Sequence, residues 1–210
     1  MTKNFLLLAG TAVLVAGCAA PLPVGERPKI AASDLDQLVA LSKRDFKARG
    51  IAGMDRVELD AAMRACNLHN DNPPREVSQP LEEQILKSIP FPQGSLLGDW
   101  KRGQPLAQSG RGMTWSDKPN TANGGSCYNC HQLSPQEESF GTLGTSLRNF
   151  GKIRGTSEAI QRYTYGKIYN SKAYNLCSQM PRMGHSKTLN EQQIKDLTAY
   201  LLDPNSPVNK

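Results

Sequence analysis

The pentapeptide Cys127-Tyr128-Asn129-Cys130-His131 is the feature that most restricts what this chain can fold into. Its C-x-x-C-H spacing is typical of covalent haem c attachment, because two thiols on one helical turn can bond the two porphyrin vinyl groups while the adjacent imidazole faces the iron. We therefore expect one covalently bound haem c, with Cys127 and Cys130 as anchors and His131 as the proximal ligand. Iron held in this way changes oxidation state, which predicts electron transfer.

Other uses of a C-x-x-C pair fit this chain less well. A zinc site needs a second pair of ligands at comparable spacing, whereas the remaining candidates stand singly at Cys66, His69, Cys177 and His185. A thioredoxin-like dithiol opens the helix of a βαβ unit, but the residues before the motif, 120–126, predict a loop without a preceding strand. Haem attachment is the interpretation that we retain.

The N-terminus indicates export from the cytoplasm. Lys3 precedes an apolar run over residues 5–16 that is too short for a stable membrane span, so residues 1–17 are predicted to be a signal peptide. The run ends in Val-Ala-Gly-Cys at residues 15–18, which resembles the lipobox of bacterial lipoproteins. We expect a periplasmic protein anchored to the membrane by a lipid on Cys18. Ordinary cleavage one or two residues later is the alternative.

Export to an oxidising compartment favours a disulfide between Cys66 and Cys177. Of the five cysteines, Cys18 is lipidated or removed and two are used by the haem, which leaves this pair. Two separate buried thiols, or one free reactive thiol, remain open as alternatives, because a sequence does not show the geometry that a disulfide needs.

The exported chain divides into three predicted parts. Residues 18–32 form a tether that is rich in proline, residues 33–95 form a helical N-terminal extension, and residues 96–210 form the haem domain. In the extension, Ser33 is the expected N-cap of a first helix, and further helices are expected over 55–66 and 81–89. The first helix should bury one apolar face, made of Leu35, Leu38, Val39 and Phe46. No segment has a convincing strand pattern, so we predict an all-α protein.

The haem domain has the order of elements found in class I cytochromes c, which it resembles. A helix over 97–108 precedes the haem motif, and a C-terminal helix with Thr188 as N-cap follows it. In that family the first and last helices cross where a small residue meets an aromatic one, and Gly103 and Tyr200 could fill these roles. The expected fold is thus a class I cytochrome c-like haem domain with a helical N-terminal extension.

Met180 is the expected distal iron ligand. It stands in a Pro- and Gly-rich loop outside any helical pattern, and its thioether would raise the reduction potential relative to a second imidazole. Met183 and His185 are the competing candidates. The proximal imidazole also needs a hydrogen-bond partner for its other nitrogen. Class I cytochromes usually have Gly-Pro-x-Leu where this chain has Gly-Thr-Ser-Leu at 144–147, so the Thr145 carbonyl is the predicted acceptor.

The C-terminal part of the chain also resembles a narrower family, the SoxX subunits of SoxAX cytochromes. The family-like segments include 144–155, 163–175, Met180-Pro181-Arg182 and the last nine residues, 202–210. The resemblance implies Cys127 and Cys130 as anchors and His131 and Met180 as ligands. Thr145 in place of the usual proline and the lipobox in place of a plain secretory signal are departures from the family.

This resemblance implies partners and a reaction. SoxAX is similar to an L-cysteine S-thiosulfotransferase, in which thiosulfate is joined to a cysteine of the carrier protein SoxYZ. The sulfur chemistry occurs at a cysteine-ligated haem of the SoxA subunit, and the SoxX haem passes the electrons to a diffusible cytochrome c. We therefore expect a redox subunit without a catalytic residue of its own, in a heterodimer with a SoxA-like haem subunit. A stand-alone electron carrier and a non-redox haem-binding module are the alternatives.

The charge of the chain fits such partners better than it fits DNA or RNA. The formal net charge of +6 is a modest basic bias, and no Lys/Arg cluster of the nucleic-acid-binding type is present in the sequence. We expect an acidic protein partner and no nucleic acid.

Overall fold

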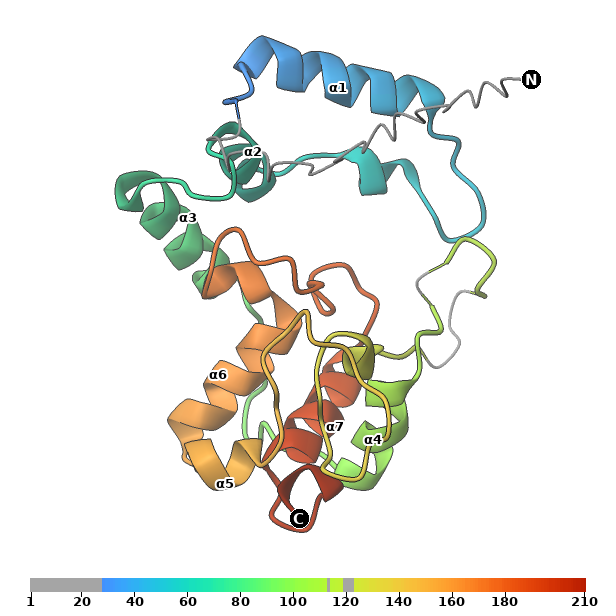
Figure 1. Cartoon of the computed structure of the whole chain (residues 1–210), viewed down its shortest axis with the longest axis vertical. Coiled ribbons are helices and arrows are strands. Elements are labelled where there is room, and N and C mark those ends of the chain that lie inside the picture. Colours follow the sequence, from blue (N-terminus) through green and yellow to red (C-terminus); the bar gives the residue numbers. More distant parts are fainter. Residues whose placement is uncertain (1–27, 113, 119–122) are drawn as a thin grey trace, which may run out of the picture.

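The computed structural model describes residues 28–112, 114–118 and 123–210, and this part of the chain is helical, as predicted (Figure 1). Its only β-type pairing is an isolated bridge between Arg49 and Ala52. The helices are α1 (Ala32–Asp45), η1 (Met54–Val57), α2 (Ala61–Leu68), α3 (Arg75–Lys87), α4 (Trp100–Gln108), η2 (Cys127–Asn129), α5 (Phe150–Arg154), α6 (Glu158–Tyr169), η3 (Ser171–Ala173), α7 (Glu191–Leu202) and η4 (Pro207–Asn209). The predicted signal peptide, Cys18 and most of the tether lie outside the described residues. No helix in the described ranges combines the length and apolar character that crossing a membrane requires.

The α4–α7 crossing is the main helix contact of the fold, and it confirms the arrangement expected for a class I cytochrome c. Gly103 of α4 lies directly against the Asp196 carbonyl and the Tyr200 Cβ of α7, so that any side chain at position 103 would overlap them. Tyr200 is almost fully buried. The small-residue and aromatic roles predicted for Gly103 and Tyr200 are therefore both found.

An ion pair reinforces the same crossing. The buried Asp196 carboxylate accepts hydrogen bonds from the Arg102 guanidinium, at 2.9 and 3.0 Å, and from the Asp99 backbone N–H at 2.8 Å. Asp99 is itself the N-cap of α4, since its side chain accepts from the Lys101 N–H. The start of α4 is thus tied to the middle of α7 by both backbone and side-chain contacts.

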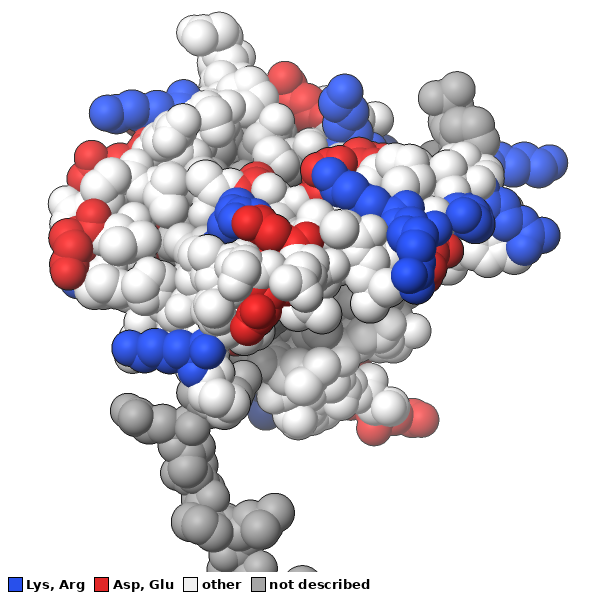
Figure 2. All heavy atoms as spheres, turned by 90° about the horizontal axis from the view of Figure 1, so that it is seen from above, with Lys and Arg blue, Asp and Glu red and all other residues white. Residues whose placement is uncertain are grey.

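The N-terminal extension lies at the end of the molecule opposite the C-terminus (Figure 1). Leu35 is buried in α1, but Leu38 is 51% exposed, so the prediction that Leu38 belongs to the buried face is wrong. The reason is that, among the described helices, α1 packs mainly against η1 and α2, and most of its residues are exposed to solvent. At this end of the molecule, acidic and basic side chains are interspersed on the surface (Figure 2). Ion pairs join Lys43 to Glu58 and Arg64 to Asp36.

A disulfide joins the extension to the rest of the protein. Cys66 of α2 is bonded to Cys177, 111 residues further along the chain, which confirms the predicted pairing. Around it, Ala62, Ala65, Cys66 and Leu176 form a small core that is separate from the main one. The main core is built around α4, α6 and α7 and includes the fully buried Tyr165 and Leu133.

Several predicted helix limits need correction. Ser33 lies inside α1, whose N-cap is Ala31. The N-cap of α7 is Asn190 rather than Thr188, because a full capping box forms there: Asn190 accepts from the Gln193 N–H, and the Gln193 side chain accepts from the Asn190 N–H. At α7 a second polar residue nearby was compatible with the same local pattern, whereas Ala31 precedes α1 without a side-chain cap.

Some helices also differ from the prediction in length, and two helices were not expected at all. The segment expected as one helix over 55–66 is divided into η1 and α2, because Asp60 caps α2 through the Met63 N–H. Helix α3 begins at Arg75, directly after Pro74, and continues through Pro80, so it is longer than the expected 81–89. Helices α5 and α6 were not predicted.

Candidate haem site

The attachment motif forms a tight turn that starts from a residue in the left-handed backbone conformation. Ser126 has φ of 49°, and η2 follows it directly. The Cys127 carbonyl accepts from the N–H groups of Cys130, at 3.1 Å, and His131, at 2.9 Å. Both cysteines are free thiols in the described chain. The turn thus presents two thiols and an imidazole from one short segment, as the C-x-x-C-H spacing predicts.

The proximal imidazole is oriented by the following loop. The His131 Nδ1 lies 2.6 Å from the Thr145 carbonyl oxygen, which confirms the predicted acceptor. A carbonyl can only accept, so the Nδ1 must carry the proton and the Nε2 keeps its lone pair for a metal. The loop that supplies this carbonyl is held to the motif by hydrogen bonds from the Gly141 N–H to the Tyr128 carbonyl, at 2.8 Å, and from the Gly144 N–H to the Cys130 carbonyl, at 2.7 Å.

Gly144 provides the space for the imidazole ring. A Cβ at this position would overlap three of the ring atoms of His131. The backbone of Gly144 therefore packs directly on the ring, and a side chain there would push the ring away from the Thr145 carbonyl.

The surroundings of the Cys127 thiol disfavour its thiolate form. Burial raises its pKa to about 12, so at neutral pH the folded chain holds it as the neutral thiol. Thiolate is the reactive form of cysteine. This environment suits a sulfur whose role is a permanent thioether bond.

Met180 lies at the edge of the main core. Its side chain is half-buried and packs against the main core, as does that of Cys127. The Met180 carbonyl accepts from the Ser171 hydroxyl at 2.7 Å. Of the competing candidates, Met183 is 4% exposed inside the main core, and His185 is exposed. The assignment of Met180 as distal ligand stays a prediction.

The described residues fit a covalently bound haem. Cys127 and Met180 both pack against the main core, and Cys130 and His131 follow Cys127 in the same short turn. Gly144 leaves room for the imidazole where any other residue would not. Soft sulfur and imidazole donors are the ligand types of haem iron.

Several residues that hold the segment around Met180 were not predicted. Arg182 forms an ion pair with Asp60, the Leu176 N–H donates to Glu82 at 2.9 Å, and the buried Lys172 ammonium donates to the Leu176 carbonyl at 2.9 Å. The only local signal was the proximity of Arg182 to Met180 in the sequence. The partners Asp60 and Glu82 lie 122 and 94 residues away from the groups that they bind, where no pattern connects them.

Comparison with known proteins identifies related chains. The family model described as cytochrome c matches residues 98–203, which is just over half of this chain. A protein of Aquifex aeolicus (strain VF5) that carries the name "Uncharacterized lipoprotein" is 29% identical over 210 residues. That alignment spans 98% of this chain and 97% of the relative.

Proposed function

This chain belongs to the cytochrome c family and so carries covalently attached haem c, and we propose that it is the electron-accepting subunit of a SoxAX-type thiosulfate-oxidising complex. Haem c supplies a one-electron couple between ferric and ferrous iron. Cys127 and Cys130 would hold it, and the Thr145 carbonyl would orient His131 as the iron ligand. The His131–Thr145 hydrogen bond is the observation that carries the electron-transfer role, because it fixes the tautomer that an iron ligand needs.

The proposal of a SoxAX role is supported by how the family-like segments pack together. Asn209, near the C-terminus, accepts from the Gly151 N–H at 2.8 Å and donates to the Leu201 carbonyl at 3.0 Å. The Asn149 N–H donates to the Val208 carbonyl at 2.7 Å. Two of the family-like segments, 144–155 and 202–210, thus form a single packed unit, which gives their similarity a common structural cause.

The proposed reaction requires an electron acceptor. A carrier thiol and thiosulfate form a sulfur–sulfur bond with release of one proton and two electrons. This chain would accept the electrons one at a time and pass them to a diffusible cytochrome c. The formation of the sulfur–sulfur bond is assigned to the SoxA-like partner. In agreement with this division, Cys177, the cysteine nearest to Met180 in the sequence, is engaged in the disulfide and offers no free thiol.

Reconstitution with the partner tests this division of labour. The purified protein should cycle between ferric and ferrous states with artificial donors, while thiosulfate and a SoxYZ-type carrier together should leave it oxidised. Addition of a SoxA-like subunit should give thiosulfate-dependent reduction, followed by the visible absorption of the haem. Rapid reduction without that subunit would place the sulfur chemistry in this chain. Purification as a single haem subunit that never associates with the partner would favour a stand-alone carrier.

A further inference from the structure

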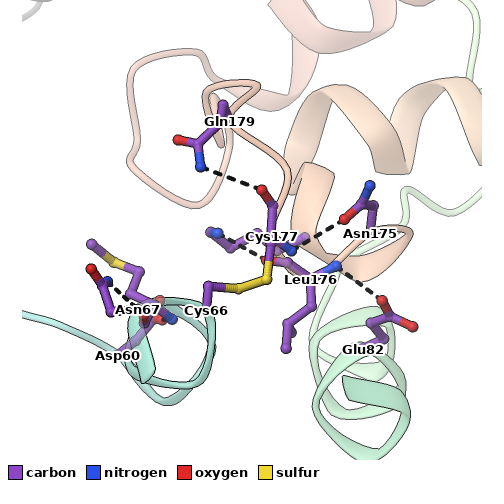
Figure 3. Close-up of a disulfide and its surroundings, with 10 residues drawn as sticks. Asp60, Cys66, Asn67, Glu82, Asn175, Leu176, Cys177 and Gln179 are labelled. Carbon is purple, nitrogen blue, oxygen red and sulfur yellow. Dashed lines mark hydrogen bonds between the residues drawn. A yellow bond between two sulfur atoms is a disulfide. The ribbon is translucent and has the colours of Figure 1, made fainter. Parts of the chain in front are cut away.

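The segment that carries Met180 is held by the N-terminal extension on both sides of this residue. We call residues 171–185 the distal segment. Three residues before Met180, Cys177 is bonded to Cys66 of α2, and Figure 3 shows how the disulfide connects α2 to the distal segment. Two residues after Met180, the Arg182 guanidinium pairs with Asp60, the N-cap of the same helix, and its other nitrogen lies 3.5 Å from the Met63 sulfur.

A further element of the extension binds the backbone of the distal segment. The Glu82 carboxylate of α3 accepts from the Leu176 N–H, and Lys172 donates to the Leu176 carbonyl (Figure 3 shows the Glu82 contact). The Leu176 side chain is 1% exposed and packs in the small core with Ala62 and Ala65. The backbone and the side chain of this residue are therefore both fixed by partners.

These contacts are concentrated where the distal ligand is expected. Asp60 and Cys66 are on one short helix, α2, and both reach the distal segment within three residues of Met180. A covalent bond and a partly buried ion pair limit the movement of a segment more than its own local hydrogen bonds do. Dissociation of a Met ligand from haem iron requires movement of the segment that carries it.

We propose that the extension acts as a clamp that positions Met180 for iron ligation, with Asp60 and Cys66 as positioning residues. The clamp rests on the proposed electron-transfer function, because it concerns the ligand that sets the reduction potential of the haem. Its effect is to keep Met180 bound in the ferric state, in which loss of the thioether would lower the potential. The extension therefore tunes the haem through the position of Met180.

Two variants of the intact haem protein test the clamp. In the double variant Cys66→Ser/Cys177→Ser the covalent connection is lost, and in Asp60→Asn the charge is lost while asparagine can still cap α2. Arg64→Gln, in the same helix as Cys66, is the matched control: it breaks the ion pair of Arg64 with Asp36 of α1, and that pair involves no residue of the distal segment. Covalent haem, measured by mass spectrometry, and far-UV circular dichroism verify that each variant is folded.

The measurements are the ferric Met-to-iron charge-transfer band, the reduction potential and the rate at which added imidazole binds the ferric haem. This rate reports how often Met180 leaves the iron. It should rise at least about tenfold in the double cysteine variant and roughly two- to fivefold in Asp60→Asn, with a weaker band and a lower potential in both. The control should match the wild type.

The outcomes separate the clamp from the function on which it rests. If Asp60→Asn and the folded double variant keep the wild-type band, potential and imidazole rate, the clamp is wrong. If the band survives in Met180→Ala, Met180 is not the ligand, and the clamp is overturned together with the ligand assignment. Failure of the reconstituted thiosulfate assay would leave all three readouts unchanged, because none of them requires a partner protein.

Discussion

At the residue scale, the proximal side of the site depends on backbone atoms more than on side chains. Thr145 stands where class I cytochromes usually have proline, yet its carbonyl accepts from His131 as a proline carbonyl would. The side chain of Thr145 is exposed and is not needed for this contact. Gly144 is the more restrictive position, because the imidazole ring lies directly against it.

Substitution of Gly144 by alanine should damage the proximal side. The new Cβ would overlap the His131 ring, and relief requires movement of the ring or of the loop. We expect a loss of about 1–3 kcal/mol in the free energy of unfolding, measured by denaturant titration, together with a perturbed haem spectrum. Gly110→Ala is the control, because the atom nearest to its Cβ would be the Ser126 hydroxyl oxygen at 3.2 Å, which can rotate away. Equal stability of the two variants would contradict the close packing on the ring.

The Asp196 carboxylate predicts how stability depends on pH. Burial opposes its charged form, but donation from Arg102, the Asp99 backbone and Gln192 outweighs burial and holds the pKa of Asp196 below its ordinary value of 3.8. A lowered pKa in the folded state adds stability above about pH 4, and this contribution disappears as the pH falls through the folded pKa.

We therefore expect the wild type to lose free energy of unfolding on acidification below about pH 4. In Asp196→Asn, stability at neutral pH should fall by about 1–2 kcal/mol, and the acid-dependent loss should be smaller. Denaturant titrations at a series of pH values measure both quantities. An unchanged slope of stability against pH in the variant would show that Asp196 is not responsible.

At the element scale, the α4–α7 crossing decides how closely two helices approach. Glycine inside a helix is unfavourable by about 1 kcal/mol relative to alanine, so Gly103 weakens α4 when this helix is considered alone. In the structure, Gly103 lets the α4 backbone reach the carbonyl of Asp196, and the Arg102–Asp196 ion pair forms at the same place. Tertiary packing therefore outweighs local helix propensity.

The variant Gly103→Ala measures this balance. If α4 stood alone, alanine would stabilise it, but the Cβ would overlap backbone atoms of α7 that cannot rotate away. We expect a net destabilisation of about 1–3 kcal/mol in thermal or denaturant unfolding. Gln108→Ala, at the exposed end of the same helix, should change stability by less than about 0.5 kcal/mol. A stabilised Gly103→Ala protein would mean that the helices are not in contact at this point.

At the scale of the whole molecule, the extension and the haem-binding part behave as one unit joined by the disulfide, the ion pair and the small core. The lipoprotein relative from Aquifex aeolicus is aligned over 98% of this chain, so the likeness includes the N-terminal region as well as residues 98–203. Anchoring of the whole unit by a lipid on Cys18 stays a prediction from the lipobox pattern at residues 15–18.

Replacement of Cys18 tests this anchoring. Membrane affinity grows by about 0.8 kcal/mol per buried methylene, so two acyl chains hold a protein firmly. In cells that export the full chain, the haem protein should be in the membrane fraction for the wild type and in the soluble periplasmic fraction for Cys18→Ser, as detected by haem staining. Ala19→Ser, next to the cysteine, is the control. Haem staining that stays in the membrane fraction of Cys18→Ser cells would show that a lipid on Cys18 is not the anchor.

The parts of this protein that could be predicted are those whose chemistry is local in the chain. The two anchors and the proximal ligand are neighbours at 127–131, and the carbonyl that orients His131 is only 14 residues away, in a loop short enough to return to it. The disulfide could be predicted because few cysteines were left to choose from. The helix crossing at Gly103 followed from a resemblance to a known arrangement.

The contacts of the distal segment could not be predicted, because they join groups that are distant in the sequence and have many equivalent alternatives. Arg182 could have paired with any of 19 acidic side chains, and the ion pair with Asp60 exists because α2 is held beside the distal segment by the disulfide and the small core. Leu38 was expected to be buried because it shares a helical face with Leu35 and Val39, whereas its exposure depends on how little of α1 contacts the rest of the protein. Local bonding rules specify which atoms can act as ligands. Only the packing of the complete chain brings Asp60 and Glu82 to the segment that carries Met180.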